Sequence, residues 1–166
     1  MPGPYQPLVD GWKSIAGIAD WSPPDTSDRA MTFTIPLDID GVTVEGLFLR
    51  ARTYEQSLNR DVMFQMELAP TLGRERVPLL RIDWLPRARS HKNPDKTQVF
   101  GSHFHTFEGN WLEQEQRMRT GSLPYAEAVP QEVGTYGKLL DFARERFRIR
   151  NMDTIPIPEW SMTMFS

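Results

Sequence analysis

The chain has 166 residues, a formal net charge of −3 and a pI near 5.6, so it carries no overall attraction to nucleic acids or anionic membranes. It contains no cysteine, which excludes disulfides, thiolate metal sites and a cysteine nucleophile. The length fits a single domain spanning residues 1–166. No basic start precedes an apolar run, and no apolar run reaches membrane-spanning length, so we expect a cytoplasmic protein with no membrane partner.

Residues 1–28 predict an N-terminal arm or a short helix. Trp12, Ile15 and Ile18 have helical spacing within an apolar stretch. The sequence Ser-Pro-Pro-Asp at 22–25 then ends any helix. We therefore expect either a short helix or a packed arm before the first strand.

Residues 31–107 predict an antiparallel sheet of about five strands. Apolar and polar residues alternate on both sides of Asp40-Gly41, a dipeptide typical of a two-residue hairpin turn. Further alternating runs follow at 62–68, 77–85 and 98–107. Residues 70–76 predict a turn between two of them. Because no helix separates these runs, we expect short connections and antiparallel pairing.

The C-terminal part predicts the main helix and an extended tail. Residues 136–148 carry an apolar stripe at helical spacing and are expected to cover one face of the sheet. One or two helical turns are expected before it, at 111–118. The tail 151–166 contains an Ile-Pro-Ile-Pro sequence that cannot be helical and predicts extended backbone. The fold class is therefore α+β, an antiparallel sheet of about five strands with a C-terminal helix packed on one face.

The three histidines of the chain, His91, His103 and His105, fall within a short stretch of sequence. Residues two apart on a strand share a face, so His103 and His105 are expected to project side by side. Phe100 and Phe104 are then expected to pack on the other face. The loop that contains His91 connects this strand to the preceding one, so all three imidazoles are expected to meet.

Two kinds of chemistry fit this cluster. The first is acid–base cleavage of RNA without a cofactor, in which His91, His103 and His105 transfer protons at a phosphodiester. Arg81 and Asp83 would join the catalytic residues if their strand pairs with the histidine strand. The segment between positions 74 and 96 contains seven basic and three acidic residues, and this excess of positive charge favours an anionic substrate. The expected substrate-binding residues are Arg87, Arg89, Lys92 and Asn93.

The second kind of chemistry is metal binding. One divalent metal ion would be held by His103 and His105 together with His91 or a carboxylate. The candidate carboxylates are Asp83, Asp95 and Glu108. A third interpretation is purely structural: the cluster is polar surface, and Arg81 and Asp83 form a cross-strand ion pair. The protein would then be a non-enzymatic interaction module, either an inhibitor or a defence partner.

Three spaced motifs in residues 80–105 carry a resemblance to known proteins: Arg-x-Asp at 81–83, His-x-Asn-Pro-Asp at 91–95 and Gly-x-His-x-His at 101–105. This combination resembles small uncharacterised bacterial families and, more distantly, the toxin components of toxin–antitoxin pairs. Lys96 stands where members of these families typically have glycine. The resemblance implies a toxin- or defence-type ribonuclease, with RNA and a cognate antitoxin as partners, and it assigns no catalytic residue.

Overall fold

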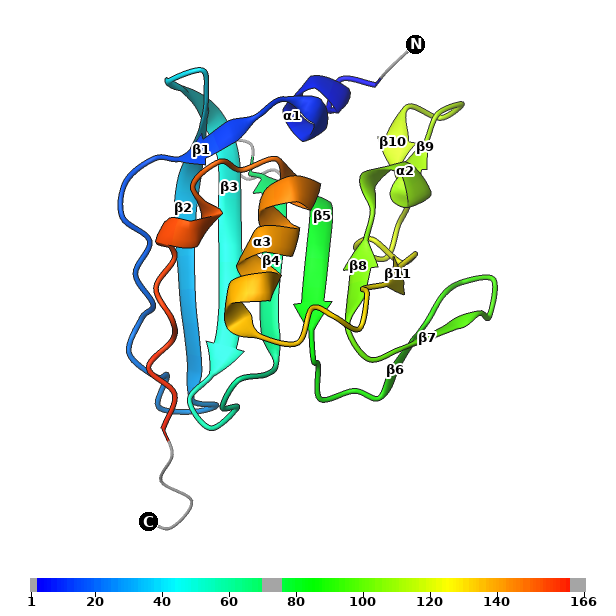
Figure 1. Cartoon of the computed structure of the whole chain (residues 1–166). Helices are drawn as coiled ribbons and strands as arrows, with labels where there is room; N and C mark the ends of the chain where they lie inside the picture. The colour runs from blue at the N-terminus through cyan, green and yellow to red at the C-terminus, as the bar shows by residue number, and fades with distance from the viewer. Residues whose placement is uncertain (1–2, 70–75, 162–166) are drawn as a thin grey trace.

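The computed structural model describes residues 3–69 and 76–161 (Figure 1). Among these residues, seven strands form one antiparallel sheet in the order β1-β2-β3-β4-β5-β8-β11. They are β1 Lys13–Ile15, β2 Ala30–Ile39, β3 Val42–Tyr54, β4 Val62–Leu68, β5 Val77–Trp84, β8 His103–His105 and β11 Glu127–Ala128. The α+β class is confirmed. The strand number exceeds the expected five because short strands outside the alternating runs, β1 and β11, extend both edges.

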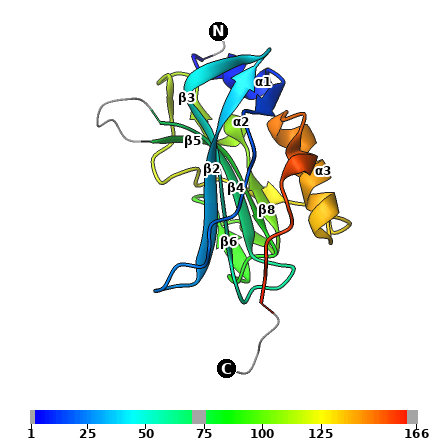
Figure 2. The ribbon, with the colours of Figure 1, turned by 90° about the vertical axis from the view of Figure 1, so that its left-hand side faces the viewer.

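One face of the sheet is apolar and is covered by helix α3, Tyr136–Phe147, as the edge-on view in Figure 2 shows. The strand register aligns one apolar residue from each of five successive strands. These are Phe33, Ala51, Phe64, Ile82 and Phe104, all buried. Such cross-strand packing under a helix supplies most of the favourable burial in an α+β domain.

Helix α3 begins and ends at residues whose local chemistry explains its bounds. The Thr135 side chain accepts a hydrogen bond from the backbone N–H of Lys138, which caps the first turn. Leu139, Ala143 and Phe147 recur every four residues, and all three are fully buried. Arg148 follows with φ of +54°, a left-handed conformation that ends helices. The prediction of a helix at 136–148 is confirmed.

The opposite face of the sheet carries polar side chains. The same register aligns Arg50, Gln65, Arg81 and His105 on β3, β4, β5 and β8. We call these four residues the polar ladder. Because side chains alternate along a strand, each of them points away from the face that α3 covers.

The hairpin predicted at Asp40-Gly41 is confirmed. Asp40 has φ of +52° and Gly41 has φ of +78°, and β2 and β3 pair on either side of them. Two consecutive positive φ angles define the turn type whose twist matches that of paired strands. These two residues are therefore sufficient to predict the position of the turn in this hairpin.

The prediction of one strand over 98–107 is wrong. β7, Gln98–Phe100, pairs with a strand of its own, β6 at Ser90–Lys92, whereas β8 pairs with β5. Gly101 separates β7 from β8 with φ of +74°, a conformation that glycine adopts at little cost. Phe100 is 70% exposed, so the expectation that it packs beside Phe104 is also wrong. The bend creates a second hairpin, β6–β7, next to β8.

The helical turns expected at 111–118 are also wrong. A short helix, α2 at Phe107–Asn110, precedes this segment, which forms a small hairpin of β9, Trp111–Leu112, and β10, Arg117–Met118. The Trp111 ring stacks on that of Phe107 with centroids 5.5 Å apart. This aromatic contact fixes the hairpin against the body of the protein.

Both terminal segments pack against the sheet, and they meet each other (Figure 1). The N-terminal segment forms helix α1, Gln6–Asp10, and then β1. A short helix is present, but the helix expected from the spacing of Trp12, Ile15 and Ile18 is wrong, because Ile15 lies in β1 and Ile18 is exposed. The prediction of an extended tail over 151–166 is wrong at its start, where Met152–Thr154 form the 3-10 helix η1. The Ile-Pro-Ile-Pro sequence after η1 is not helical, as predicted. The Pro156 carbonyl accepts hydrogen bonds from Trp21 Nε1 and the Tyr136 hydroxyl, each at 2.9 Å. Residues 70–75 of the turn expected at 70–76 and the last residues, 162–166, lie outside the described residues.

Candidate metal centre

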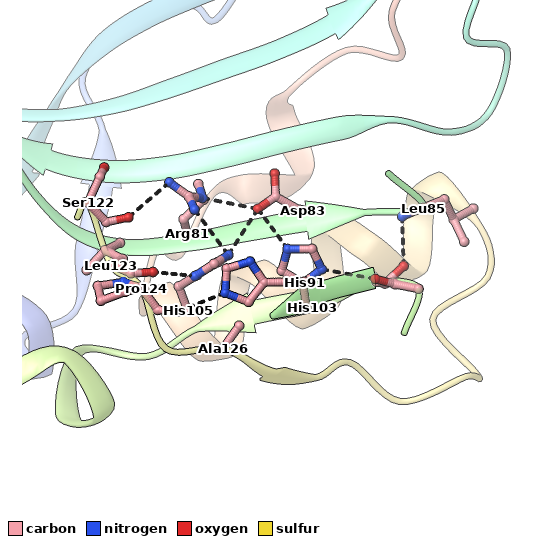
Figure 3. A network of polar contacts seen from close by, with 12 residues as sticks. Arg81, Asp83, Leu85, His91, His103, His105, Ser122, Leu123, Pro124 and Ala126 are labelled. Atoms are coloured by element: carbon pink, nitrogen blue, oxygen red, sulfur yellow. Dashed lines mark hydrogen bonds and ion pairs between the residues drawn. The ribbon is translucent and has the colours of Figure 1, made fainter. Parts of the chain in front are cut away.

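The structure brings His91, His103 and His105 into mutual contact on the polar face of the sheet (Figure 3). His103 and His105 come from β8, and His91 comes from β6 of the adjoining hairpin. The ring centroids of the three imidazoles are 5.1, 4.9 and 4.9 Å apart. One ring nitrogen from each histidine lies within 4.8 Å of the other two. The predicted meeting of all three histidines is confirmed.

Each imidazole is oriented by a backbone carbonyl. His103 Nδ1 donates to Gly101 O at 3.0 Å, His105 Nδ1 donates to Leu123 O at 2.6 Å, and His91 Nε2 donates to Pro124 O at 2.8 Å. A carbonyl oxygen only accepts hydrogen bonds, so the ring nitrogen that faces it must carry the proton. In the neutral imidazole the remaining nitrogen then keeps its lone pair. The protein therefore fixes one tautomer for each ring.

Asp83 adds a carboxylate oxygen to this group of nitrogens. The β5–β8 register places it opposite His103, and its Oδ2 lies 3.3 Å from His103 Nε2 and 3.2 Å from His105 Nε2. Ligands about 2.0–2.1 Å from a tetrahedral metal ion are separated from one another by about 3.3 Å. The spacing between the carboxylate and the two imidazoles is that of ordinary ion pairs, and it also equals the distance between neighbouring ligands of a metal ion.

Arg81 completes the polar contacts of the cluster. Its Nε donates to Asp83 Oδ2 at 3.1 Å, its Nη1 donates to Ser122 O at 3.4 Å, and its Nη2 lies 3.2 Å from His105 Nε2. The expected ion pair between Arg81 and Asp83 is present, but it joins two residues of β5, so the expectation that it crosses between strands is wrong. The carbonyl on Nδ1 makes Nε2 of a neutral His105 an acceptor for the arginine. Arg81 and a metal ion would therefore compete for the same lone pair.

Burial and charge set the protonation of Asp83 and His105. Burial alone would raise the pKa of Asp83, but its polar contacts with the His103 and His105 rings and the charge of Arg81 outweigh it and lower the pKa below its ordinary value. Burial lowers the pKa of His105, and the charge of Arg81 adds to this effect while Asp83 opposes it. These directions favour a carboxylate beside a neutral imidazole, the states in which both bind metals.

Two buried asparagines hold the segment 123–126 that supplies two of the three carbonyls. Asn93 accepts a hydrogen bond from Ala126 N at 2.9 Å and donates to Ala126 O at 3.0 Å. Asn110 does the same with Tyr125, at 2.8 and 2.9 Å. Sequence reasoning proposed Asn93 for substrate binding and missed Asn110. Both amides form hydrogen bonds with the backbone, so we infer that they position the histidine cluster.

The expected basic residues are distributed unevenly around the cluster. Arg87 turns away from the histidines, because its Nε lies 3.2 Å from Asp61 Oδ2 and its guanidinium lies 4.8 Å from the centroid of the Tyr54 ring. Arg89 and Lys92 are both exposed. Arg89 directly precedes β6, and Lys92 lies on β6, the strand that carries His91. Their role in substrate binding stays a prediction.

The other candidate carboxylates lie elsewhere. Glu108 is exposed on α2 and lines a cavity with Phe104 and Arg146 on the α3 side of the sheet. Thr106 caps α2 by accepting a hydrogen bond from Gly109 N, so the alternation of β8 stops before Glu108. Asp95 accepts from Thr97 N at 3.0 Å in the β6–β7 turn. Asp83 is therefore the carboxylate of the cluster.

The turn between β6 and β7 bears on the family resemblance. Lys96 has φ of +74°, a left-handed conformation that glycine adopts at lower cost. Its N–H donates to Asn93 O at 2.8 Å, which closes the turn. Lysine is therefore accommodated here in the backbone geometry that a glycine would take.

In comparisons with known proteins, no family model, curated protein sequence or solved structure matches this chain. The resemblance to toxin-like families stays a prediction. Among the described residues, no helix is both long enough and apolar enough to cross a membrane. Function is therefore inferred from the geometry of the histidine cluster.

Proposed function

We propose that this protein is a metal-dependent hydrolase that binds one divalent transition metal ion, preferably zinc, through His91, His103 and His105. The observation that supports the proposal is the orientation of the three imidazoles. Each donates one N–H to a backbone carbonyl and keeps the other nitrogen as a lone pair, and one ring nitrogen of each histidine lies within 4.8 Å of the other two. Metal-binding histidines are commonly fixed in this way. Three lone pairs and a carboxylate together form a site for a cation.

Burial favours metal binding over acid–base cleavage of RNA by the histidines alone. His103 is 5% exposed and His105 is fully buried. A general acid or base must come within hydrogen-bond distance of the substrate, and a fully buried ring already bonded to backbone cannot do so. A buried ring is no obstacle to metal binding, because ligands enclose the ion.

The residues of the cluster divide the work of hydrolysis. A bound divalent ion polarises a phosphoryl or carbonyl oxygen and lowers the pKa of a bound water. Asp83, whose side chain is 20% exposed and contacts two of the imidazoles, would serve as the fourth ligand or accept a proton from water. Arg81 donates to Asp83 and stabilises negative charge that develops beside it.

The first test is metal content. We expect the dialysed wild-type protein to retain about one equivalent of zinc by elemental analysis, and the His103→Ala, His105→Ala double variant to retain none. Glu108→Gln is the matched control, because this residue lies outside the cluster, and it should bind zinc like the wild type. Added zinc should also raise the unfolding temperature of the wild type and should leave that of the double variant unchanged. A wild type that binds no added zinc would reject the proposal.

The second test separates the metal-dependent mechanism from acid–base catalysis, with RNA as the substrate. We expect RNA cleavage by the zinc-loaded protein, loss of cleavage on chelation and recovery on adding zinc back. Cleavage that persists in chelator would favour the acid–base ribonuclease instead. Growth arrest on expression of the wild type, but not of the double variant, is the expected result for a toxin- or defence-type role in the cytoplasm.

A further inference from the structure

A basic groove lies on the polar face of the sheet, next to the histidine cluster. It has a volume of about 570 Å³, and the described residues that line it include four arginines and no acidic residue. The arginines are Arg50, Arg76, Arg117 and Arg119. In a chain with a net charge of −3, this concentration of guanidinium groups creates a local field that attracts anions.

The groove is continuous with the metal centre. Ser122 and Leu123 line it, and their carbonyls accept hydrogen bonds from Arg81 and His105 at the centre. Arg50 and His105 belong to the same polar ladder, three strand spacings apart, or about 14 Å at the usual distance between strands. A ligand that lies extended along the groove would therefore reach the histidines.

Two of the arginines share a single carboxylate. Glu67 is buried, and its two oxygens lie 2.7 Å from Arg50 Nε and 3.4 Å from Arg76 Nε. Arg50 Nε is buried, and its partner is the Glu67 carboxylate, with which it forms an ion pair. One carboxylate balances one of these two guanidinium groups, so this part of the groove keeps a net positive charge.

The other two arginines lie on and beside the β9–β10 hairpin. Arg119 Nε donates to Gly109 O at 3.1 Å, and its guanidinium lies 4.7 Å from the centroid of the Tyr125 ring. Arg117 pairs with Glu115 at 2.6 Å, and both side chains are half exposed. An exposed ion pair of this kind is weak and exchanges readily for a stronger phosphate contact.

We propose that this groove binds single-stranded nucleic acid through its phosphate groups and directs one phosphodiester to the metal centre. The second part rests on the proposed metal-dependent function. Arginine suits this ligand, because its planar fork donates two parallel hydrogen bonds to a phosphate. Tyr5, which also lines the groove, offers an aromatic ring on which a base can stack.

The experiment measures binding of a short fluorescent single-stranded oligoribonucleotide by anisotropy, in chelator and at several salt concentrations. Chelator separates binding from metal chemistry, so this test fails or succeeds independently of the metal assay. We expect wild-type binding that weakens steeply with salt. Arg117→Gln with Arg119→Gln should weaken binding at least about tenfold and flatten the salt dependence.

The matched control is Arg60→Gln with Lys138→Gln, which removes the same charge from exposed positions outside the groove. It should change affinity by no more than about twofold. Arg117→Gln alone tests the half-exposed position, where loss of folding is not expected.

Three results would overturn the proposal. These are absence of wild-type binding at low salt, equal loss of binding in both double variants, and competition by a mononucleotide or inorganic phosphate as effective as that by the oligonucleotide. The last result would assign the groove to a small phosphorylated ligand. If the oligonucleotide binds but the wild type retains no zinc in the separate metal assay, the proposed groove is supported and the metal-dependent function is rejected.

Discussion

The two faces of the central sheet are built from the same strands but do different work. On the α3 face, the register aligns five apolar residues under a helix, and the row is buried throughout. On the opposite face, the same register aligns Arg50, Gln65, Arg81 and His105. Buried polar groups contribute little net stability and need partners, whereas buried apolar groups stabilise without them. We infer that the α3 face stabilises the fold and that the polar face carries the candidate functional residues.

The partners of the polar face show how it tolerates burial. His105 is fully buried, but its two nitrogens contact the Leu123 carbonyl, Asp83 and Arg81. Removal of one member of such a network leaves buried polar groups unpaired, so a substitution here should disturb the histidine cluster as well as the fold. The two faces should therefore respond differently to substitution.

The largest effect on stability should come from Trp84 on the α3 face. Trp84 is fully buried, and its Nε1 donates to Val133 O at 2.9 Å. Trp84→Ala should lower the free energy of unfolding by about 3–5 kcal/mol, because it leaves a cavity and an unpaired carbonyl. Chemical denaturation measures this change. Below the unfolding transition the variant should still bind one zinc ion, and a loss of less than about 1 kcal/mol would contradict the assignment of the α3 face.

Lys13 is a charged exception among the buried residues on the α3 side, and it predicts a pH effect. Its Nζ donates to the carbonyls of Leu8, Val9 and Gly11, at 2.7, 3.2 and 2.5 Å. Burial, with a smaller effect of the Arg148 charge, lowers its pKa from 10.5 to about 8. Between these values the unfolded chain binds more protons than the folded protein, so stability rises with pH. The rise should reach about 2 kcal/mol by about pH 9.5.

A matched variant isolates this contribution. In Lys13→Met the rise in the free energy of unfolding between neutral pH and about pH 9.5 should disappear. Burial raises the pKa of Tyr136, which lowers stability only above the ordinary tyrosine pKa of 10.0, so the measurement stays below that pH. Parallel curves for wild type and variant would show that Lys13 keeps its proton throughout.

The sequence predicted those features that depend on short-range patterns. Alternation identified β2 to β5, and helical spacing identified α3. Asp40-Gly41 marked its hairpin because two adjacent residues determine that turn. The His-x-His spacing placed His103 and His105 on one face for the same reason, since it needs only the period of a strand.

The features that sequence reasoning missed depend on contacts between distant segments. Leu123 and Pro124 orient His105 and His91 through carbonyls, which every residue possesses, so no residue type marks them. Asn110 holds Tyr125 across 15 positions of sequence. Glu108 was expected at the cluster because of its proximity in sequence, whereas the cap of α2 carries it to the other side of the sheet.

The smallest predicted effect concerns Arg81, and it tests whether the histidine cluster binds a cation. Arg81 Nη2 lies 3.2 Å from His105 Nε2, where it competes with a metal ion for the lone pair and repels it by charge. Arg81→Gln should therefore tighten zinc binding by about tenfold, or about 1.4 kcal/mol, in a competition titration against a chelating dye. Arg87→Gln removes the same charge at Asp61 and should leave affinity unchanged. Weaker binding in Arg81→Gln would mean that Arg81 serves mainly to orient Asp83, since loss of that ion pair would then outweigh the removal of a competing charge.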